Sequence, residues 1–182
     1  MKKFTATLLA SSLLGLAAYA QGTLNFVNAG GGVNAPIYMN DGSTKLGTGF
    51  TAELFAGSSS ANMVSVASTG FLSGGGAGYF QGGVVTLASI APGATATLQL
   101  RVWATSSGSY AAASAANLAN TWGQSSIFTV ATGGVGSPPS TPSALTGLTS
   151  FNLNAGGVIP EPSSLALAGL GAAAMLVFRR RK

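Results

Sequence analysis

The chain contains neither cysteine nor histidine, and these two absences remove several kinds of chemistry at once. Without cysteine there is no disulfide framework and no thiolate nucleophile. Without histidine a serine–histidine–aspartate site cannot form, and zinc loses its usual ligands. The sequence therefore predicts no catalytic residues, no metal site and no cofactor.

Charge is also scarce, because charged residues make up only 6% of the chain against about 25% in an average soluble domain. The formal net charge is +5, but six of the eight cations lie at the two ends of the chain. The body between them, residues 21–157, holds the cations Lys45 and Arg101 and the carboxylates Asp41 and Glu53, so it is neutral. Nucleic-acid binding needs many cations on one surface, so the composition excludes it.

The carboxylates of the body form a poor catalytic pair. A glycosidase needs two carboxylates placed across a sugar bond, and Asp41 and Glu53 are the only carboxylates in the sequence of the body. Asp41 lies in the turn sequence Asn40-Asp41-Gly42, which favours a local backbone role, whereas Glu53 alternates outward on an expected strand. A glycosidase that uses this pair is the least favoured function. A single carboxylate is likewise a poor calcium site.

Residues 1–20 contain the three parts of a secretory signal peptide in the right order. Lys2 and Lys3 come first, residues 4–17 form an apolar run, and Ala18-Tyr19-Ala20 has the small-x-small pattern of a cleavage site. We expect signal peptidase to recognise Ala18 and Ala20 and to cut before Gln21. An ordinary buried N-terminal helix is the alternative, and it does not explain this order.

Residues 165–178 carry no charge and are followed directly by a basic cluster. As a helix this segment would span about 21 Å, which is short for a bilayer core of about 30 Å unless the helix begins near Pro162. Basic residues resist translocation, so we expect at least transient membrane insertion with the body outside. The residues expected to stop the tail at the inner side are Arg179, Arg180, Arg181 and Lys182.

The motif Pro160-Glu161-Pro162 precedes this apolar segment, and its prolines favour an extended, accessible backbone. Pro-Glu-Pro, a short apolar helix and a terminal basic cluster together resemble the PEP-CTERM sorting signal of Gram-negative bacteria that make extracellular polysaccharide. The resemblance covers residues 158–182, with the motif at 160–162, the helix at 163–178 and the basic tail at 179–182. It implies recognition by an exosortase and removal of the tail at or near the motif. The recognised residues would be Pro160, Glu161 and Pro162. A plain rigid linker before an anchor is the alternative.

The sequence of the body, residues 21–157, predicts an all-β fold with one short helix. Several short apolar or alternating runs separated by turn signals are typical of an antiparallel β-sandwich or jelly roll. The clearest strand is 96–103, where Leu98 and Leu100 face one way and Arg101 the other. An alanine-rich run at 110–119 predicts the helix. The other expected strands are 23–28, 36–39, 50–55, 63–67, 79–80, 84–90, 127–130 and 148–153, with an irregular connector at 133–142.

Four aromatic residues remain as candidates for a ligand contact: Tyr79, Trp103, Tyr110 and Trp122. Aromatic faces can stack on sugar rings while neighbouring amide and guanidinium groups donate hydrogen bonds. Most tryptophan and tyrosine side chains nevertheless lie at the margin of a core, and we favour that interpretation for these four.

The body is also similar to uncharacterised proteins that carry the same kind of tail, in runs such as Ala35-Pro36-Ile37-Tyr38, Gln99-Leu100-Arg101-Val102-Trp103 and Gly147-Leu148-Thr149-Ser150-Phe151. That similarity implies no activity. We expect a non-enzymatic protein in a structural or adhesive role, exported through the inner membrane to the cell surface or extracellular matrix. A carbohydrate-binding module that contacts exopolysaccharide is the main alternative, and a self-assembling subunit is a third. Signal peptidase, exosortase and the membrane are the expected partners.

Overall fold

Strand β7 (Thr95–Ala104) is the centre of the larger of two sheets, and its side chains alternate as the sequence predicts. Leu98 and Leu100 are completely buried, whereas Arg101 on the other face is half-buried. The computed structural model describes residues 21–136 and 138–156. Along most of its length β7 pairs with the antiparallel strand β4 (Phe50–Gly57).

The larger sheet has the order β5-β4-β7, and two short strands share the remaining edge of β7. β5 (Val64–Gly70) pairs with β4, while β8 (Trp122–Gln124) and β9 (Phe128–Ala131) pair with opposite halves of β7. All of these pairs are antiparallel. Ser125 lies in the gap between β8 and β9, and its hydroxyl accepts a hydrogen bond from the N–H of Leu100 at 3.0 Å. A side chain thus continues the ladder where the strand is interrupted.

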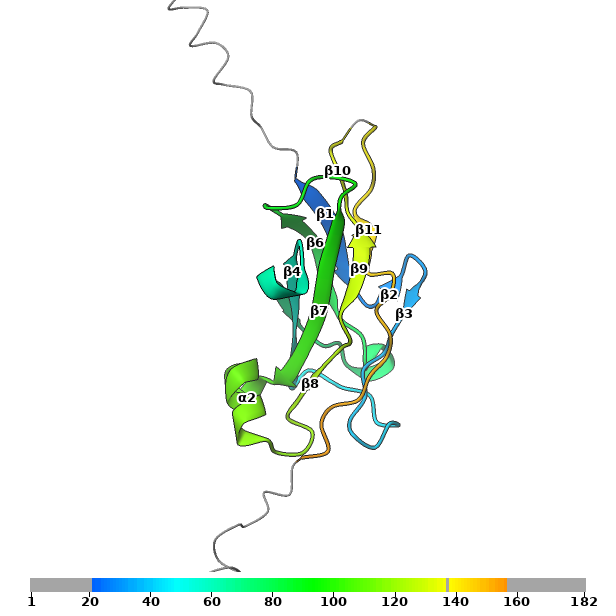
Figure 1. Cartoon of the computed structure of the whole chain (residues 1–182). Helices are drawn as coiled ribbons and strands as arrows, with labels where there is room; N and C mark the ends of the chain where they lie inside the picture. The colour runs from blue at the N-terminus through cyan, green and yellow to red at the C-terminus, as the bar shows by residue number, and fades with distance from the viewer. Residues whose placement is uncertain (1–20, 137, 157–182) are drawn as a thin grey trace, which may run out of the picture.

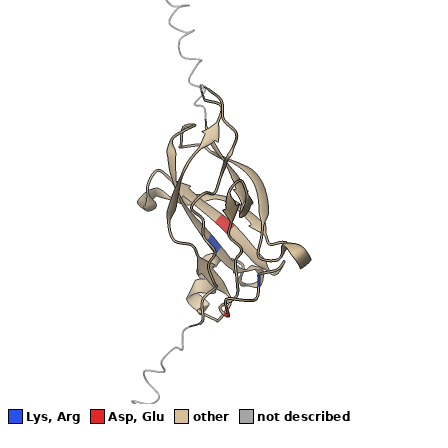
Figure 2. Ribbon diagram, turned by 90° about the vertical axis from the view of Figure 1, so that its right-hand side faces the viewer, with Lys and Arg blue, Asp and Glu red and all other residues tan. Residues whose placement is uncertain are grey.

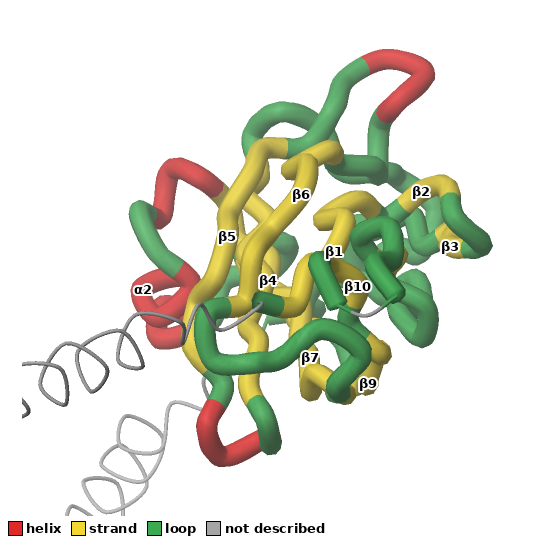
Figure 3. Tube along the Cα trace, turned by 90° about the horizontal axis from the view of Figure 1, so that it is seen from above, coloured by secondary structure: helices red, strands yellow, loops and turns green. Residues whose placement is uncertain are grey.

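The smaller sheet is built around β1 (Gly22–Val27). One edge of β1 pairs with the antiparallel strand β6 (Gln81–Leu87), and the other pairs with β10 (Gly133–Gly134) in antiparallel and β11 (Ser143–Ala144) in parallel direction. A separate hairpin consists of β2 (Ala29–Gly30) and β3 (Val33–Asn34). Figure 1 shows the arrangement of the strands, and the view from above in Figure 3 shows β5 and β6 side by side at one margin.

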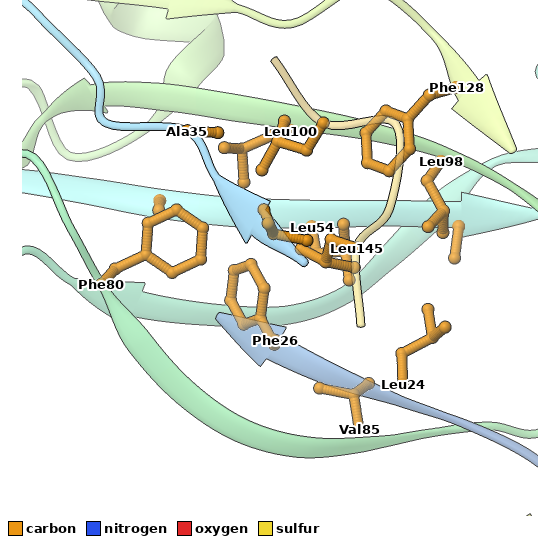
Figure 4. Close-up of a cluster of buried hydrophobic side chains, with 14 of the residues drawn as sticks. Leu24, Phe26, Ala35, Leu54, Phe80, Val85, Leu98, Leu100, Phe128 and Leu145 are labelled. Carbon is orange, nitrogen blue, oxygen red and sulfur yellow. The ribbon is translucent and has the colours of Figure 1, made fainter. Parts of the chain in front are cut away.

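One apolar core fills the space between the two sheets. Figure 4 shows side chains from both sheets and from the loops converging on it. Phe80 packs against Phe26 and Phe71, with ring centroids 4.8 and 5.6 Å apart. Each large apolar side chain buried in this way stabilises the fold by about 1.5–3 kcal/mol. Leu24, Leu54, Leu98, Leu100 and Leu145 are all completely buried in this core.

Helix α2 (Tyr110–Ala116) is the single α-helix in the part of the chain that the structure describes. The hydroxyl of Ser109 caps its start by accepting a hydrogen bond from the N–H of Ala112 at 3.1 Å. Asn117 adopts a left-handed conformation with φ of 48° and ends the helix, three residues before the predicted end. Short 3-10 turns are η1 (Ser60–Asn62), η2 (Gly74–Gly76) and η3 (Thr105–Ser107).

The predicted all-β body with antiparallel sheets and one short helix is confirmed. Several details differ from the expected strands. Segment 79–80 forms only an isolated bridge between Phe80 and Phe71, the hairpin of β2 and β3 was not predicted, and β10 lies within the expected irregular connector. Segments 36–39 and 148–153 are not regular strands, since they meet only through an isolated parallel bridge between Tyr38 and Asn152. Strand β8 was not predicted, because three residues with a central glycine carry too short a pattern. The helices expected at 1–20 and 163–178 lie outside the described residues.

Candidate functional site

The outer face of the larger sheet gathers most of the candidate residues. The antiparallel register places Glu53 opposite Arg101, and Arg101 opposite Gln124. The next outward pair on β7 and β8 is Trp103 with Trp122. Residues directly opposite on neighbouring strands point to the same face, so side chains from β4, β7 and β8 form one row here.

Arg101 is the centre of this row. Its guanidinium carbon lies 4.0 Å from the ring centroid of Phe55 and 5.2 Å from that of Tyr110, in cation–π geometry. Its Nε donates a hydrogen bond to Oε1 of Gln99 at 3.3 Å. The guanidinium is therefore held in one place by two aromatic rings and an amide.

Helix α2 adds Tyr110 to the same face. The Tyr110 hydroxyl donates to Oε1 of Gln124 at 2.9 Å, and its ring meets Trp122 edge to face at 5.8 Å. Burial raises the pKa of the Tyr110 hydroxyl, and the positive charge of Arg101 partly opposes that increase. We call Phe55, Gln99, Arg101, Tyr110, Trp122 and Gln124 the aromatic–amide face.

The structure brings together three of the four predicted aromatic contacts. Trp103, Tyr110 and Trp122 lie on or under the aromatic–amide face, but Trp103 is only 8% exposed and has no free ring face. Tyr79 lies elsewhere, where its hydroxyl donates to Oδ1 of Asn34 at 2.8 Å and its ring faces Nζ of Lys45. Phe55 and Gln124 were not singled out from the sequence. Only the pairing of β4 and β8 with β7 shows that they belong here.

The two carboxylates of the body have separate local partners. Asp41 accepts hydrogen bonds from the N–H groups of Ser43 and Thr44, at 2.9 and 2.8 Å, and from the Thr44 hydroxyl at 2.6 Å. Glu53 accepts a hydrogen bond from the hydroxyl of Ser65. Figure 2 shows the charged residues in two groups, one in the middle of the sheet and one near the lower end. The structure does not bring Asp41 and Glu53 together as a catalytic pair.

The Thr44 hydroxyl and the neighbouring N–H groups lower the pKa of the Asp41 carboxyl to about 2. The described residues contain no cluster of three or more metal-ligating histidine, cysteine or carboxylate side chains. Among the helices in the same residues, none has the length and apolar character needed to cross a membrane.

The targeting sites predicted from the sequence fall mainly outside the described part. The structure does not describe Ala18 and Ala20 of the expected signal cleavage site. It also does not describe the sorting motif Pro160, Glu161 and Pro162 or the basic residues 179–182. Gln21, the residue after the expected signal cleavage, is described and exposed at the start of the body.

Comparison with known protein families settles the nature of the tail. Residues 158–182 match the PEP-CTERM protein-sorting motif. The chain carries a PEP-CTERM sorting signal. This signal marks an exported protein that transits the membrane toward the cell surface and is an exosortase substrate. No curated protein and no solved structure matches the chain.

Proposed function

We propose that this PEP-CTERM protein is a non-enzymatic structural component of the cell surface or extracellular matrix, and that its processed body associates with further copies through unpaired strand edges. The observation that carries the proposal is the chemistry of β5 and β6. Within the described residues β5 pairs only with β4, and β6 only with β1. β5 and β6 lie side by side, and Phe71 and Phe80 form an isolated bridge just beyond them. The edge groups that another strand could pair with are therefore those beside the hollow between residues 64–66 and 86–90.

Apart from each other, the two edge strands have none of the usual protection against pairing. Soluble proteins place charged residues, proline or a covering element on such edges, but β5 and β6 contain no charged residue and no proline. Val64 at the start of β5 is 60% exposed. Residues 64–66 and 86–90 also line a hollow of about 250 Å³ between the two strands. Since the body is neutral, no long-range repulsion keeps two copies apart.

A charged substitution at this edge tests the proposal. We expect the body purified after processing to form oligomers in light-scattering measurements, and Val64→Lys to shift them toward monomer because a buried lysine at a strand pairing is unfavourable. Val135→Lys is the matched control, since Val135 is also exposed but lies outside β5 and β6. A wild-type body that stays monomeric at high concentration would argue against self-association.

The aromatic–amide face favours a second candidate, a carbohydrate-binding function directed at exopolysaccharide. Arg101 is fixed between Phe55 and Tyr110, beside the amides of Gln99 and Gln124. This combination of ring edges with fixed donors is suited to sugar hydroxyls. Under this proposal Tyr110→Ala would weaken binding in a pulldown with the host polysaccharide by about tenfold, equal to about 1.4 kcal/mol. Tyr79→Ala, outside the face, would not.

An enzymatic role is not proposed for the body. The separate hydrogen-bond partners of Asp41 and Glu53 speak against a glycosidase that uses both. A hydrolytic activity that disappeared in Asp41→Asn would overturn this part of the proposal.

A further inference from the structure

The last described segment of the chain is fastened firmly to the body. The N–H of Tyr38 donates to the carbonyl of Phe151 at 3.1 Å, and the N–H of Leu153 donates to the carbonyl of Tyr38 at 2.9 Å. The side chain of Leu153 is buried in the core. This fastening continues to within four residues of the sorting signal, which begins at residue 158.

Asn154 makes the final set of these contacts. Its N–H donates to the carbonyl of Trp122 at 2.8 Å, and its own carbonyl accepts from the N–H of Asn120 at 3.0 Å. Its side-chain oxygen accepts from the N–H groups of Thr121 and Trp122, both at 3.3 Å. Asn154 therefore joins the end of the body to the turn that connects α2 with β8.

Gly156 rests against the same turn. A Cβ atom placed on Gly156 would lie 2.8 Å from the backbone nitrogen of Ala119, so only glycine allows this close approach, and its φ of +76° favours glycine as well. The chain thus leaves the body beside residues 117–121. Figure 1 shows this exit at the lower end of the sandwich, opposite the start of β1.

The distance from this exit to the sorting motif has a strict upper limit. Pro160 is four residues beyond Gly156, and an extended chain covers at most about 3.6 Å per residue, so the two Cα atoms are within about 14 Å. A folded domain of only 100 residues already has a radius of gyration of about 13 Å. An enzyme that holds Pro160 in its active site therefore meets the end of the body.

The surface beside the exit is suited to such a contact. The turn at 117–121 exposes the apolar side chain of Leu118 at 62%, and the same turn contains Asn117 and Asn120. It is joined to the turn at 40–44, because the N–H of Asn40 donates to Oδ1 of Asn120 at 2.7 Å. We call residues 40–44, 117–121 and 154–156 the tail-proximal face.

We propose that the tail-proximal face docks against the exosortase while the sorting signal is held in its active site. This inference rests on the sorting role of the tail and is independent of what the body does after export. The fastening by Asn154 keeps the tether short, so the tail-proximal face is the part of the body that lies nearest the enzyme. The apolar side chain of Leu118 lies next to Ala119, the residue that Gly156 contacts.

The test is the rate of tail removal from the full chain in an exosortase-positive host, measured by pulse-chase and intact mass. We expect Leu118→Arg and Leu118→Glu to slow removal at least severalfold, whichever the sign of the new charge. Val135→Arg is the control, because Val135 is 79% exposed but follows β10, which pairs with the start of β1 at the other end. Thermal melting of the purified variants checks that each one folds.

A rescue experiment separates docking from a general effect of the substitutions. Six glycine and serine residues inserted after Gly156 lengthen the tether by about 20 Å, so the enzyme no longer needs to touch the body. We expect this insertion to restore removal from the Leu118→Arg chain. Equal rates for Leu118→Arg and wild type, or equal slowing by Val135→Arg, would overturn the docking proposal alone. A wild-type tail that is never removed would overturn the sorting role as well.

Discussion

Asn28 follows strand β1, and its amide lies wholly inside the body, where it joins three backbone segments. It donates to the carbonyls of Ala35 and Gly78, at 2.8 and 2.9 Å, and accepts from the N–H of Phe80 at 2.8 Å. The side chain is 0% exposed, and the Ala35 carbonyl and the Phe80 N–H depend on it for their hydrogen bonds, whereas the Gly78 carbonyl also accepts from the N–H of Ile37 at 3.0 Å. A buried polar group of this kind organises the loops around the end of β1.

Replacing this amide is expected to be costly. Asn28→Ala leaves the Ala35 carbonyl and the Phe80 N–H without partners inside the body, which destabilises the fold by about 3 kcal/mol. For a domain of this size that lowers the melting temperature by roughly 10 °C. Asn25→Ala on the outward face of β1 is the control, because the Asn25 side chain makes no hydrogen bond among the described residues. Equal melting temperatures for the two variants would contradict the role of Asn28.

The lowered pKa of the Asp41 carboxyl makes the stability of the fold depend on pH. The pKa of its carboxyl is about 2 in the folded protein against 3.8 ordinarily, so the unfolded chain takes up the proton first as the pH falls. The resulting stabilisation is complete above about pH 4 and is lost between pH 4 and 2. We expect Thr44→Val to raise the carboxyl pKa toward 3.8 in an NMR titration, since it removes the hydroxyl that contributes most. An unchanged titration midpoint would show that Thr44 is not the cause.

At the scale of elements, packing against the core requires glycine at position 82 in β6. A Cβ atom on Gly82 would lie 2.3 Å from the Cδ1 atom of Phe26, a fully buried ring in the core. Gly82→Ala therefore forces the ring or the strand to move, and we expect a loss of about 1–3 kcal/mol in chemical denaturation. Gly75→Ala is the control, because nothing lies within 4 Å of a Cβ atom there. Similar denaturation midpoints for both variants would contradict this packing argument.

The sequence predicts those elements whose pattern is local and misses those that depend on distant partners. β7 alternates over ten residues, so its outward Arg101 is predicted correctly and its expected bounds, 96–103, fall one residue short at each end. β8 forms because Trp122 and Gln124 pair with β7, and the parallel contact of β11 with β1 joins the two ends of the body. Neither pairing leaves a periodic signal. The same limit applies to Phe55 in the aromatic–amide face, whose place follows only from the register of β4 with β7.

At the scale of the whole molecule, charge is separated by segment. Of eight cations, two lie in residues 1–20 and four in residues 179–182, while the body keeps two against two carboxylates. The isoelectric point of about 10.0 therefore belongs to the segments that are expected to be removed. Processing at each end changes the net charge by a different amount, so the charge of the mature protein reports which ends have been cut.

This separation makes isoelectric focusing a direct measurement of processing. Removal of residues 1–20 alone leaves six cations against three carboxylates, so the protein stays basic. Removal of the tail at or near residues 160–162 as well leaves two cations against two or three carboxylates, and the isoelectric point falls to neutral or below. We expect the neutral form in an exosortase-positive host and the basic form in a host without the enzyme. A mature protein that stays basic in both hosts would mean that the four terminal cations remain attached and that the tail is a permanent anchor.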